Sequence, residues 1–76
     1  MNEFFAYLIK NLVDQPDHVQ VHSFQDDKGI VVEVRVKKED IGKVLGRKGS
    51  TIKALRTLAM MICARAGHRV HLVLVE

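Results

Sequence analysis

A short segment in the middle of the chain combines flexible backbone with concentrated positive charge. Gly46 and Gly49 enclose the adjacent cations Arg47 and Lys48. Glycine has no Cβ, so a sugar-phosphate chain can approach the backbone closely at such positions. A helix beginning at Ser50 would direct its first backbone N–H groups toward the same anion. The segment therefore predicts a phosphate-binding loop, although the glycines could instead serve only the geometry of a turn.

The positive charge of the chain is concentrated around this loop. The 76 residues carry 12 Lys and Arg against 9 Asp and Glu, a net charge of +3. Residues 37–56 hold seven basic and two acidic side chains, a net of +5, which leaves −2 for the rest. Lys43 and Lys53 extend this basic track one turn before and after the loop. Focused charge favours a polyanion, although the same cations could simply keep a helix surface soluble.

Three segments have the spacing of amphipathic helices, with apolar residues at intervals of three and four. They are residues 3–14, 38–45 and 50–66. In the last of these the predicted core stripe consists of Ile52, Leu55, Ala59, Ile62 and Ala66. The charged loop thus connects the second predicted helix to the third.

Three further segments have the patterns of strands, in residues 18–25, 30–36 and 69–75. The turn at residues 26–29 makes the first two an antiparallel hairpin. The two helices between the second and third strands are long enough for a parallel crossover. The order α-β-β-α-α-β therefore predicts a single α+β domain over residues 1–76, with a mixed three-stranded sheet and its helices packed on one face.

Together with this element order, the loop and its flanks resemble a KH domain of the type II topology found in bacterial proteins. The pattern is Ile41-Gly42-x-x-Leu45-Gly46-Arg47-Lys48-Gly49-x-x-Ile52. The whole chain is similar to the small stand-alone bacterial KH proteins of the KhpA (YlqC) family. The resemblance implies that the G-x-x-G loop clamps single-stranded RNA with low sequence specificity, in an RNA chaperone or post-transcriptional regulator.

The resemblance also implies a groove and partners. An apolar groove beside the loop would be lined by Ile41, Val44, Leu45 and Ile52, with residues 30–34 as its sheet wall, although these side chains could equally be core. Because the chain has no Trp, one Tyr and three Phe, bases would rest on aliphatic side chains rather than on aromatic platforms. The implied partners are RNA, a second copy of the chain and a larger KH protein of the KhpB (Jag) family, with no cofactor and no small-molecule substrate.

The third predicted helix carries more apolar side chains than one core face needs. Met60, Met61 and Ala64 lie outside the core stripe, and methionines beside small residues suit a partner surface. A 76-residue chain has a small core that gains from association. These features predict a homodimer through the three residues, although a few exposed apolar side chains are also common on monomers.

The sequence gives weaker support to three alternatives. A zinc site is disfavoured, because the four histidines do not form a compact ligand set with Cys63. An enzyme is disfavoured, because Gly49 separates Lys48 from Ser50 and the segment therefore does not match a P-loop. A KH scaffold that acts mainly through a partner protein stays open.

The sequence also predicts a cytoplasmic protein without membrane spans. It has a lone cysteine and no secretory signature, and its longest apolar run covers only residues 58–64.

Overall fold

The computed structural model describes residues 2–75, and within them the helices and strands follow the expected order. The bounds are α1 Asn2–Lys10, β1 Gln20–Asp26, β2 Gly29–Arg35, α2 Ile41–Leu45, α3 Ser50–Ala64 and β3 Val70–Val75. Short 3-10 turns occupy η1 Pro16–His18, η2 Lys38–Asp40 and η3 Arg47–Gly49. The α-β-β-α-α-β order of a type II KH domain is confirmed.

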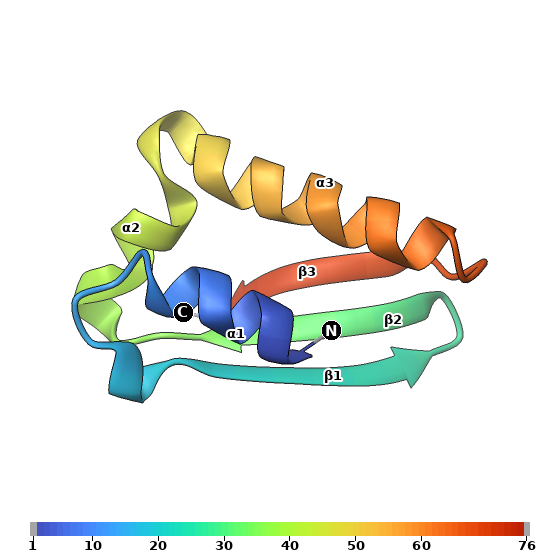
Figure 1. Cartoon of the computed structure of the whole chain (residues 1–76), viewed down its shortest axis with the longest axis horizontal. Helices are drawn as coiled ribbons and strands as arrows, with labels where there is room; N and C mark the ends of the chain where they lie inside the picture. The colour runs from blue at the N-terminus through green and yellow to red at the C-terminus, as the bar shows by residue number, and fades with distance from the viewer. Residues whose placement is uncertain (1, 76) are drawn as a thin grey trace.

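The sheet has the strand order β1-β2-β3, with β2 in the middle. Strands β1 and β2 pair antiparallel from Asp26↔Gly29 onward, and β2 pairs with β3 in parallel. Figure 1 shows α1 and α3 on the same side of the sheet, with α3 running above β3. The other face of the sheet carries no helix of the described chain, which confirms the predicted mixed sheet with helices on one face.

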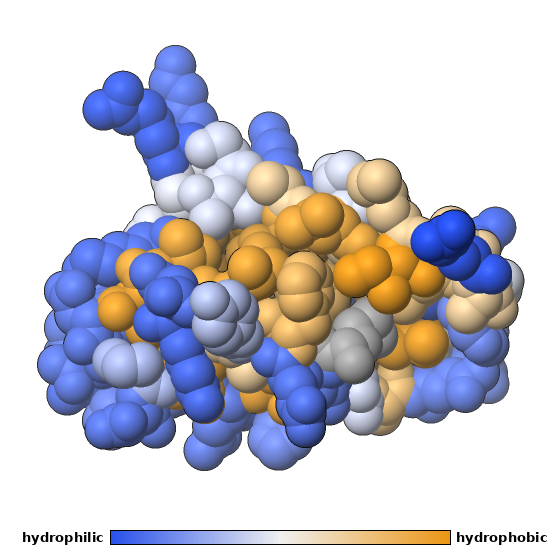
Figure 2. Space-filling model, in the orientation of Figure 1, coloured by the Kyte–Doolittle hydropathy of each residue, from blue (hydrophilic) through white to orange (hydrophobic). Residues whose placement is uncertain are grey.

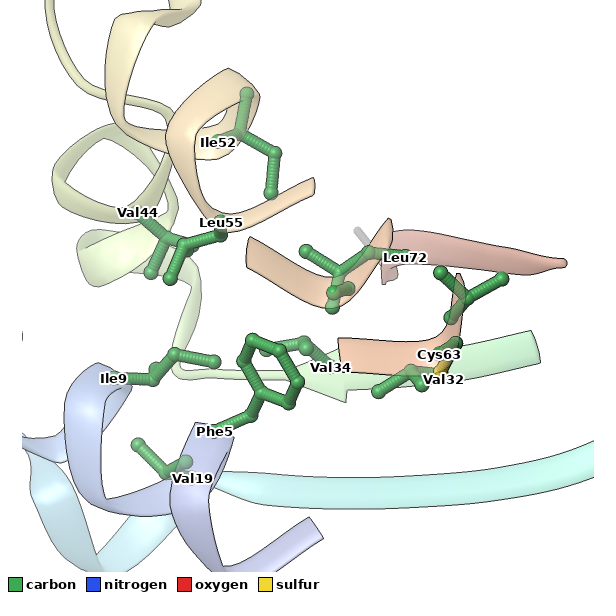
Figure 3. Packing of buried hydrophobic residues seen from close by; sticks show 12 residues of the cluster. Phe5, Ile9, Val19, Val32, Val34, Val44, Ile52, Leu55, Cys63 and Leu72 are labelled. Atoms are coloured by element: carbon green, nitrogen blue, oxygen red, sulfur yellow. The ribbon is translucent and has the colours of Figure 1, made fainter. Parts of the chain in front are cut away.

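The core lies between the helices and the sheet. Figure 3 shows Phe5 and Ile9 of α1 pointing toward Val34 of β2, and all three side chains are fully buried. The buried face of α3 consists of Ile52, Leu55, Ala59 and Cys63. The predicted stripe was therefore wrong at its C-terminal end, because a spacing of four after Ala59 reaches Cys63.

Ile62 and Ala66, the two residues assigned to the core in error, are exposed. Ile62 is 42 % exposed and lies on the flank of α3, next to the buried face. Ala66 comes after α3, which ends at Ala64. The core stripe therefore gains Cys63, and Ile62 joins the exposed apolar side chains on the outside of α3.

Helix α1 ends four residues earlier than its apolar pattern predicts. The backbone N–H groups of Asp14 and Gln15 donate to the carboxylate of Asp40, at 3.1 and 2.9 Å. In a continued helix these N–H groups would donate to carbonyls four residues earlier. The side chain of Asp40 therefore takes the hydrogen bonds that Asp14 and Gln15 would need to continue the helix, and Pro16 follows.

Among residues 2–75, no helix is both long enough and apolar enough to cross a membrane.

Candidate nucleic-acid interface

The loop between α2 and α3 is built on left-handed backbone. Gly46 (φ 74°), Lys48 (φ 56°) and Gly49 (φ 76°) all have positive φ. Gly46 closes α2 by donating its N–H to the carbonyl of Gly42 at 2.9 Å, and the N–H of Gly49 donates back to Gly46 at 3.1 Å. Lys48 is the one non-glycine residue of the described chain with positive φ, a conformation that is uncommon for a side chain of this size.

The two glycines of the loop serve different purposes. A Cβ on Gly46 would collide with Thr51 at the start of α3, lying 2.8 Å from its backbone nitrogen. A Cβ on Gly49 would come no closer than 3.9 Å, to a methyl of Ile52. Gly46 thus permits close packing inside the protein, whereas Gly49 leaves open space above the loop.

The cations predicted for the loop tip are accessible. Arg47 and Lys48 are exposed, as are Ser50 in the first position of α3 and Lys53 one turn later. Figure 2 shows hydrophilic side chains projecting from the junction of α2 and α3. No side chain caps the N-terminus of α3, and the N–H of its first residue, Ser50, donates to the carbonyl of Arg47. The positive end of the helix dipole thus points toward the exposed loop.

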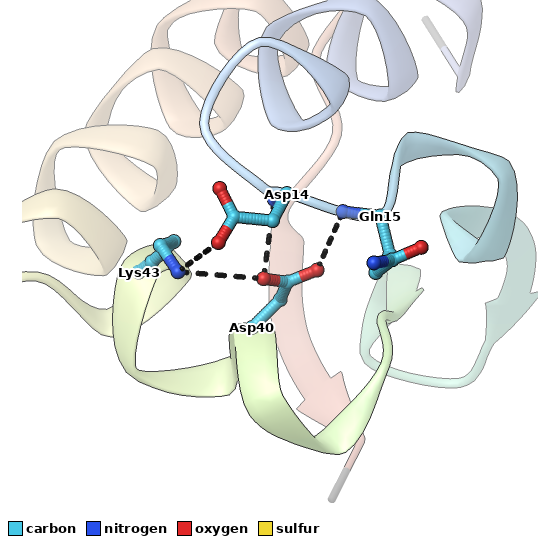
Figure 4. Close-up of polar contacts among 4 residues, drawn as sticks. All are labelled: Asp14, Gln15, Asp40 and Lys43. Carbon is cyan, nitrogen blue, oxygen red and sulfur yellow. Dashed lines mark hydrogen bonds and ion pairs between the residues drawn. The ribbon is translucent and has the colours of Figure 1, made fainter.

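Lys43 behaves differently from the other predicted contacts of the basic track. Its Nζ lies 2.7 Å from a carboxylate oxygen of Asp14 and 3.7 Å from one of Asp40 (Figure 4). The hydrogen bond to Asp14 raises the pKa of Lys43, with burial acting against it and both carboxylates adding to it. Lys43 was predicted to extend the basic track, and in the structure its charge pairs with two carboxylates.

Only part of the predicted groove lies at the surface. Ile41 and Leu45 line a shallow hollow on the outer side of α2, together with Val36, Lys38 and Gly42. Val44 and Ile52 are buried, 0 % and 3 % exposed, so they support the hollow from within the core. A Cβ on Gly42 would meet no atom within 4 Å, so this glycine faces the open hollow rather than an internal packing contact.

The predicted sheet wall, residues 30–34, is only partly accessible. Val32 and Val34 are fully buried, and the other three residues are half-buried. Strand β3 lies at the sheet edge beneath α3, and a second hollow there is lined by Arg56, Met60 and residues 70–73. Arg56 donates from Nε to the carbonyl of Leu72 at 3.2 Å.

Val36, Lys38 and Arg56 line these hollows and were not among the residues predicted for the site.

The predicted dimer residues lie on different flanks of α3. Met60 lines the hollows on the β3 side, together with Val70 and His71. Met61 lines a hollow on the outer side with Leu58, Ile62, Ala64 and Arg65, and Ala64 borders both sides. Figure 2 shows apolar side chains gathered between α1 and α3 on the viewed face.

The histidines do not gather into a metal site. Within the described part of the chain, no three His, Cys, Asp or Glu residues lie close enough to hold a metal ion together. Cys63 is buried in the core face of α3.

The comparisons with known proteins agree with this geometry. The family model described as "KhpA/KhpB, KH domain" matches residues 2–74. The chain is 47 % identical over 76 residues to "RNA-binding protein KhpA" of Chlamydia pneumoniae, covering 100 % of this chain and 97 % of the relative. The protein of the same name from Streptomyces coelicolor is 49 % identical, covering 100 % and 95 %, and that of Borreliella burgdorferi is 34 % identical over 74 residues, covering 97 % and 90 %. No solved structure gave a significant match.

This family consists of RNA-binding domains rather than enzymes, in agreement with the prediction of a non-enzymatic protein. The family model and the full-length identities show that the chain belongs to the KhpA/KhpB family of KH domains.

Proposed function

We propose that this protein binds single-stranded RNA at the loop Gly46–Gly49, with low sequence specificity, as an RNA chaperone or post-transcriptional regulator. The observation that carries the proposal is the exposed pair Arg47 and Lys48, held on a left-handed turn at the uncapped start of α3. The relatives named as RNA-binding proteins support it.

The phosphate backbone would run over the loop and the first turn of α3. Ser50 and Lys53 are exposed along this path, and the space above Gly49 leaves room for close approach. The bases would then rest on aliphatic side chains, with Ile41 and Leu45 in the hollow beside α2. Contacts of this kind hold a strand without reading much of its sequence, since every base has an apolar face.

The test is RNA binding as a function of salt. We expect a short unstructured, fluorescein-labelled RNA to bind with an affinity that falls steeply as salt rises, because cation–phosphate contacts release counterions. Replacing Arg47 or Lys48 with Met should lower the slope of log K against log salt by about 0.7 for each phosphate that the protein no longer neutralises. Fluorescence anisotropy measures both quantities, and single-stranded DNA of the same sequence shows whether the 2′-hydroxyl is read.

Lys28→Met is the matched control. It removes the same charge from the β1–β2 turn, at the opposite end of the molecule from the loop (Figure 1). If Lys28→Met weakened binding as much as Lys48→Met, the cation pair would not form a site and the loop proposal would be wrong. Gly49→Asp tests the approach path directly, because it places an acid above the loop without an internal collision.

We further propose a homodimer through α3, formed from the predicted residues Met60, Met61 and Ala64. The exposed Met61 (63 %), Ile62 (42 %) and Leu58 (39 %) favour the outer flank as its centre. Two copies would present two loops and strengthen binding to one RNA by multivalency. Sedimentation at micromolar concentration tests this proposal.

Met61→Glu should give a monomer, whereas Met60→Glu, on the β3 flank away from the proposed centre of the interface, should weaken the dimer less. The reverse result would move the interface to the β3 side, and a monomeric wild-type protein would exclude the dimer.

A second candidate function is a scaffold that acts mainly through a larger KhpB (Jag)-type protein. It is supported by the exposed apolar flank of α3 and by a family model that spans both KhpA and KhpB. Wild-type protein without measurable RNA affinity at low salt would favour this role over RNA binding. A cytoplasmic location is part of either proposal.

A further inference from the structure

The carboxylate of Asp40 connects two segments that lie far apart in the sequence. Asp40 is 1 % exposed, and its two oxygens accept the backbone N–H groups of Asp14 and Gln15. Lys43 completes the cluster by pairing with Asp14 and Asp40 (Figure 4). The linker after α1 is thereby joined to the segment that leads into α2, across 26 residues of sequence.

Helix α2 needs such an attachment. It has only five residues, of which Val44 alone is buried, and a helix this short is not stable by itself. The Gly46–Gly49 loop follows it directly, so the place and tilt of α2 determine where the loop cations stand. The apolar contacts of α2 lie toward its end, where Val44 is buried and Leu45 packs partly buried against the core, whereas the hydrogen bonds at Asp40 fix its start.

We propose that Asp40, with Lys43 and Asp14, positions α2 and thereby the Gly46–Gly49 loop for RNA, and that Lys43 acts through this cluster rather than by contacting phosphate. The inference rests on the proposed RNA-binding function of the loop. It assigns a positioning role to three charged residues. Two of them are acids, which would repel a polyanion rather than bind it directly.

The electrostatic sign separates this role from a simple charge effect. Asp40→Asn removes one negative charge, which by electrostatics alone should strengthen binding to a polyanion. Asn cannot accept two N–H groups in the same way, because one of its terminal atoms is itself a donor. The positioning role therefore predicts the opposite result, weaker binding of RNA.

The experiment compares Asp40→Asn with Asp17→Asn, which removes an equal charge from the exposed η1 turn of the same linker. Both are titrated with the labelled RNA at a temperature where circular dichroism shows each variant folded. We expect Asp40→Asn to bind about three- to tenfold more weakly, the range in which residues away from a ligand alter its affinity. Asp17→Asn should bind as tightly as wild type or slightly more tightly.

Lys43→Met provides a second test that does not depend on the folding of Asp40→Asn. A positioning role predicts weaker binding with an unchanged salt slope, because the protein neutralises the same phosphates as before. A phosphate contact predicts a slope lower by about 0.7, as for Lys48→Met. Lys43→Arg, which keeps a cation beside Asp14, should restore most of the affinity.

The outcomes distinguish this inference from the function on which it rests. If a folded Asp40→Asn binds RNA as tightly as wild type, or if Lys43→Met lowers the salt slope, the positioning role is wrong while the loop proposal stands. If neither Arg47→Met nor Lys48→Met alters RNA binding, the loop proposal itself fails. Weaker binding by Asp40→Asn and Lys43→Met, both with the wild-type slope, supports the inference.

Discussion

The two ends of helix α2 have opposite character. At its start, Asp40 is buried and its carboxylate accepts two backbone hydrogen bonds within the protein. At its end, Gly46 begins a loop of positive-φ backbone on which Arg47 and Lys48 are exposed to solvent. The carboxylate at the start has its hydrogen bonds supplied by the protein, whereas the loop leaves its two cations exposed to a ligand.

The difference shows how a small domain can place an exposed and conformationally costly loop on a short helix. Residues in sparsely populated backbone regions persist only where the surrounding structure holds them. Here Gly46 packs against Thr51 on one side of the loop, and Asp40 is fixed one helix earlier. The tip residues Lys48 and Gly49 face open space, and a ligand that approaches the loop would need this space.

The largest expected effect comes from filling the packed side of the loop. Gly46→Ala should lower the free energy of unfolding by roughly 2–4 kcal/mol, because it adds left-handed strain to a collision with Thr51. Gly42→Ala is the control, since its Cβ would enter open space inside a helix. It should raise the free energy of unfolding by about 0.5–1 kcal/mol. Urea denaturation measures both, and equal effects would contradict the distinction between the packed and open glycines.

A smaller effect is expected at the open side of the loop. Lys48→Gly should raise the free energy of unfolding by up to about 1 kcal/mol, because glycine adopts positive φ without strain. Arg47→Gly, at a neighbouring position with negative φ, should lower it by about 0.5–1 kcal/mol. Each variant has one cation fewer, so RNA affinity should fall in both. A destabilised Lys48→Gly would show that the left-handed residue is not strained.

The sequence predicted the element order and the loop well, because both depend on local patterns. Apolar periodicity identified the helices and strands, and the glycine pair with its cations identified the loop. Helix phase was less certain where neighbouring residues are both apolar. Ile62 and Cys63 could each continue the stripe of α3, and only packing against the sheet selects Cys63.

The role of Lys43 could not be predicted from its surroundings in the sequence. Its partner Asp14 lies 29 residues earlier and reaches it only because the linker after α1 folds back to Asp40. In the sequence, Asp40 has the position of an ordinary acid in a helix's first turn, a role that requires no burial. Tertiary hydrogen bonds thus give Asp40 and Lys43 partners that no local pattern indicates, whereas the exposure of Arg47 and Lys48 follows from the loop itself.

Acid tests the fixed start of α2 most specifically. This effect is the smallest of those predicted near neutral pH, because it develops only as the pH falls. Burial raises the pKa of Asp40, but hydrogen bonds from Asp14 and Gln15 and the charge of Lys43 outweigh it and hold the pKa below its ordinary 3.8. A carboxylate with a lowered folded pKa contributes stability that is complete above its unfolded value and is lost as pH falls through the folded value. The difference in unfolding free energy between wild type and Asp40→Asn should therefore be constant from neutral pH down to about pH 5 and shrink below about pH 4. Urea denaturation across this range measures the difference. If the difference in unfolding free energy were as large at the lowest pH as at neutral pH, the charge of Asp40 would not fix the start of α2.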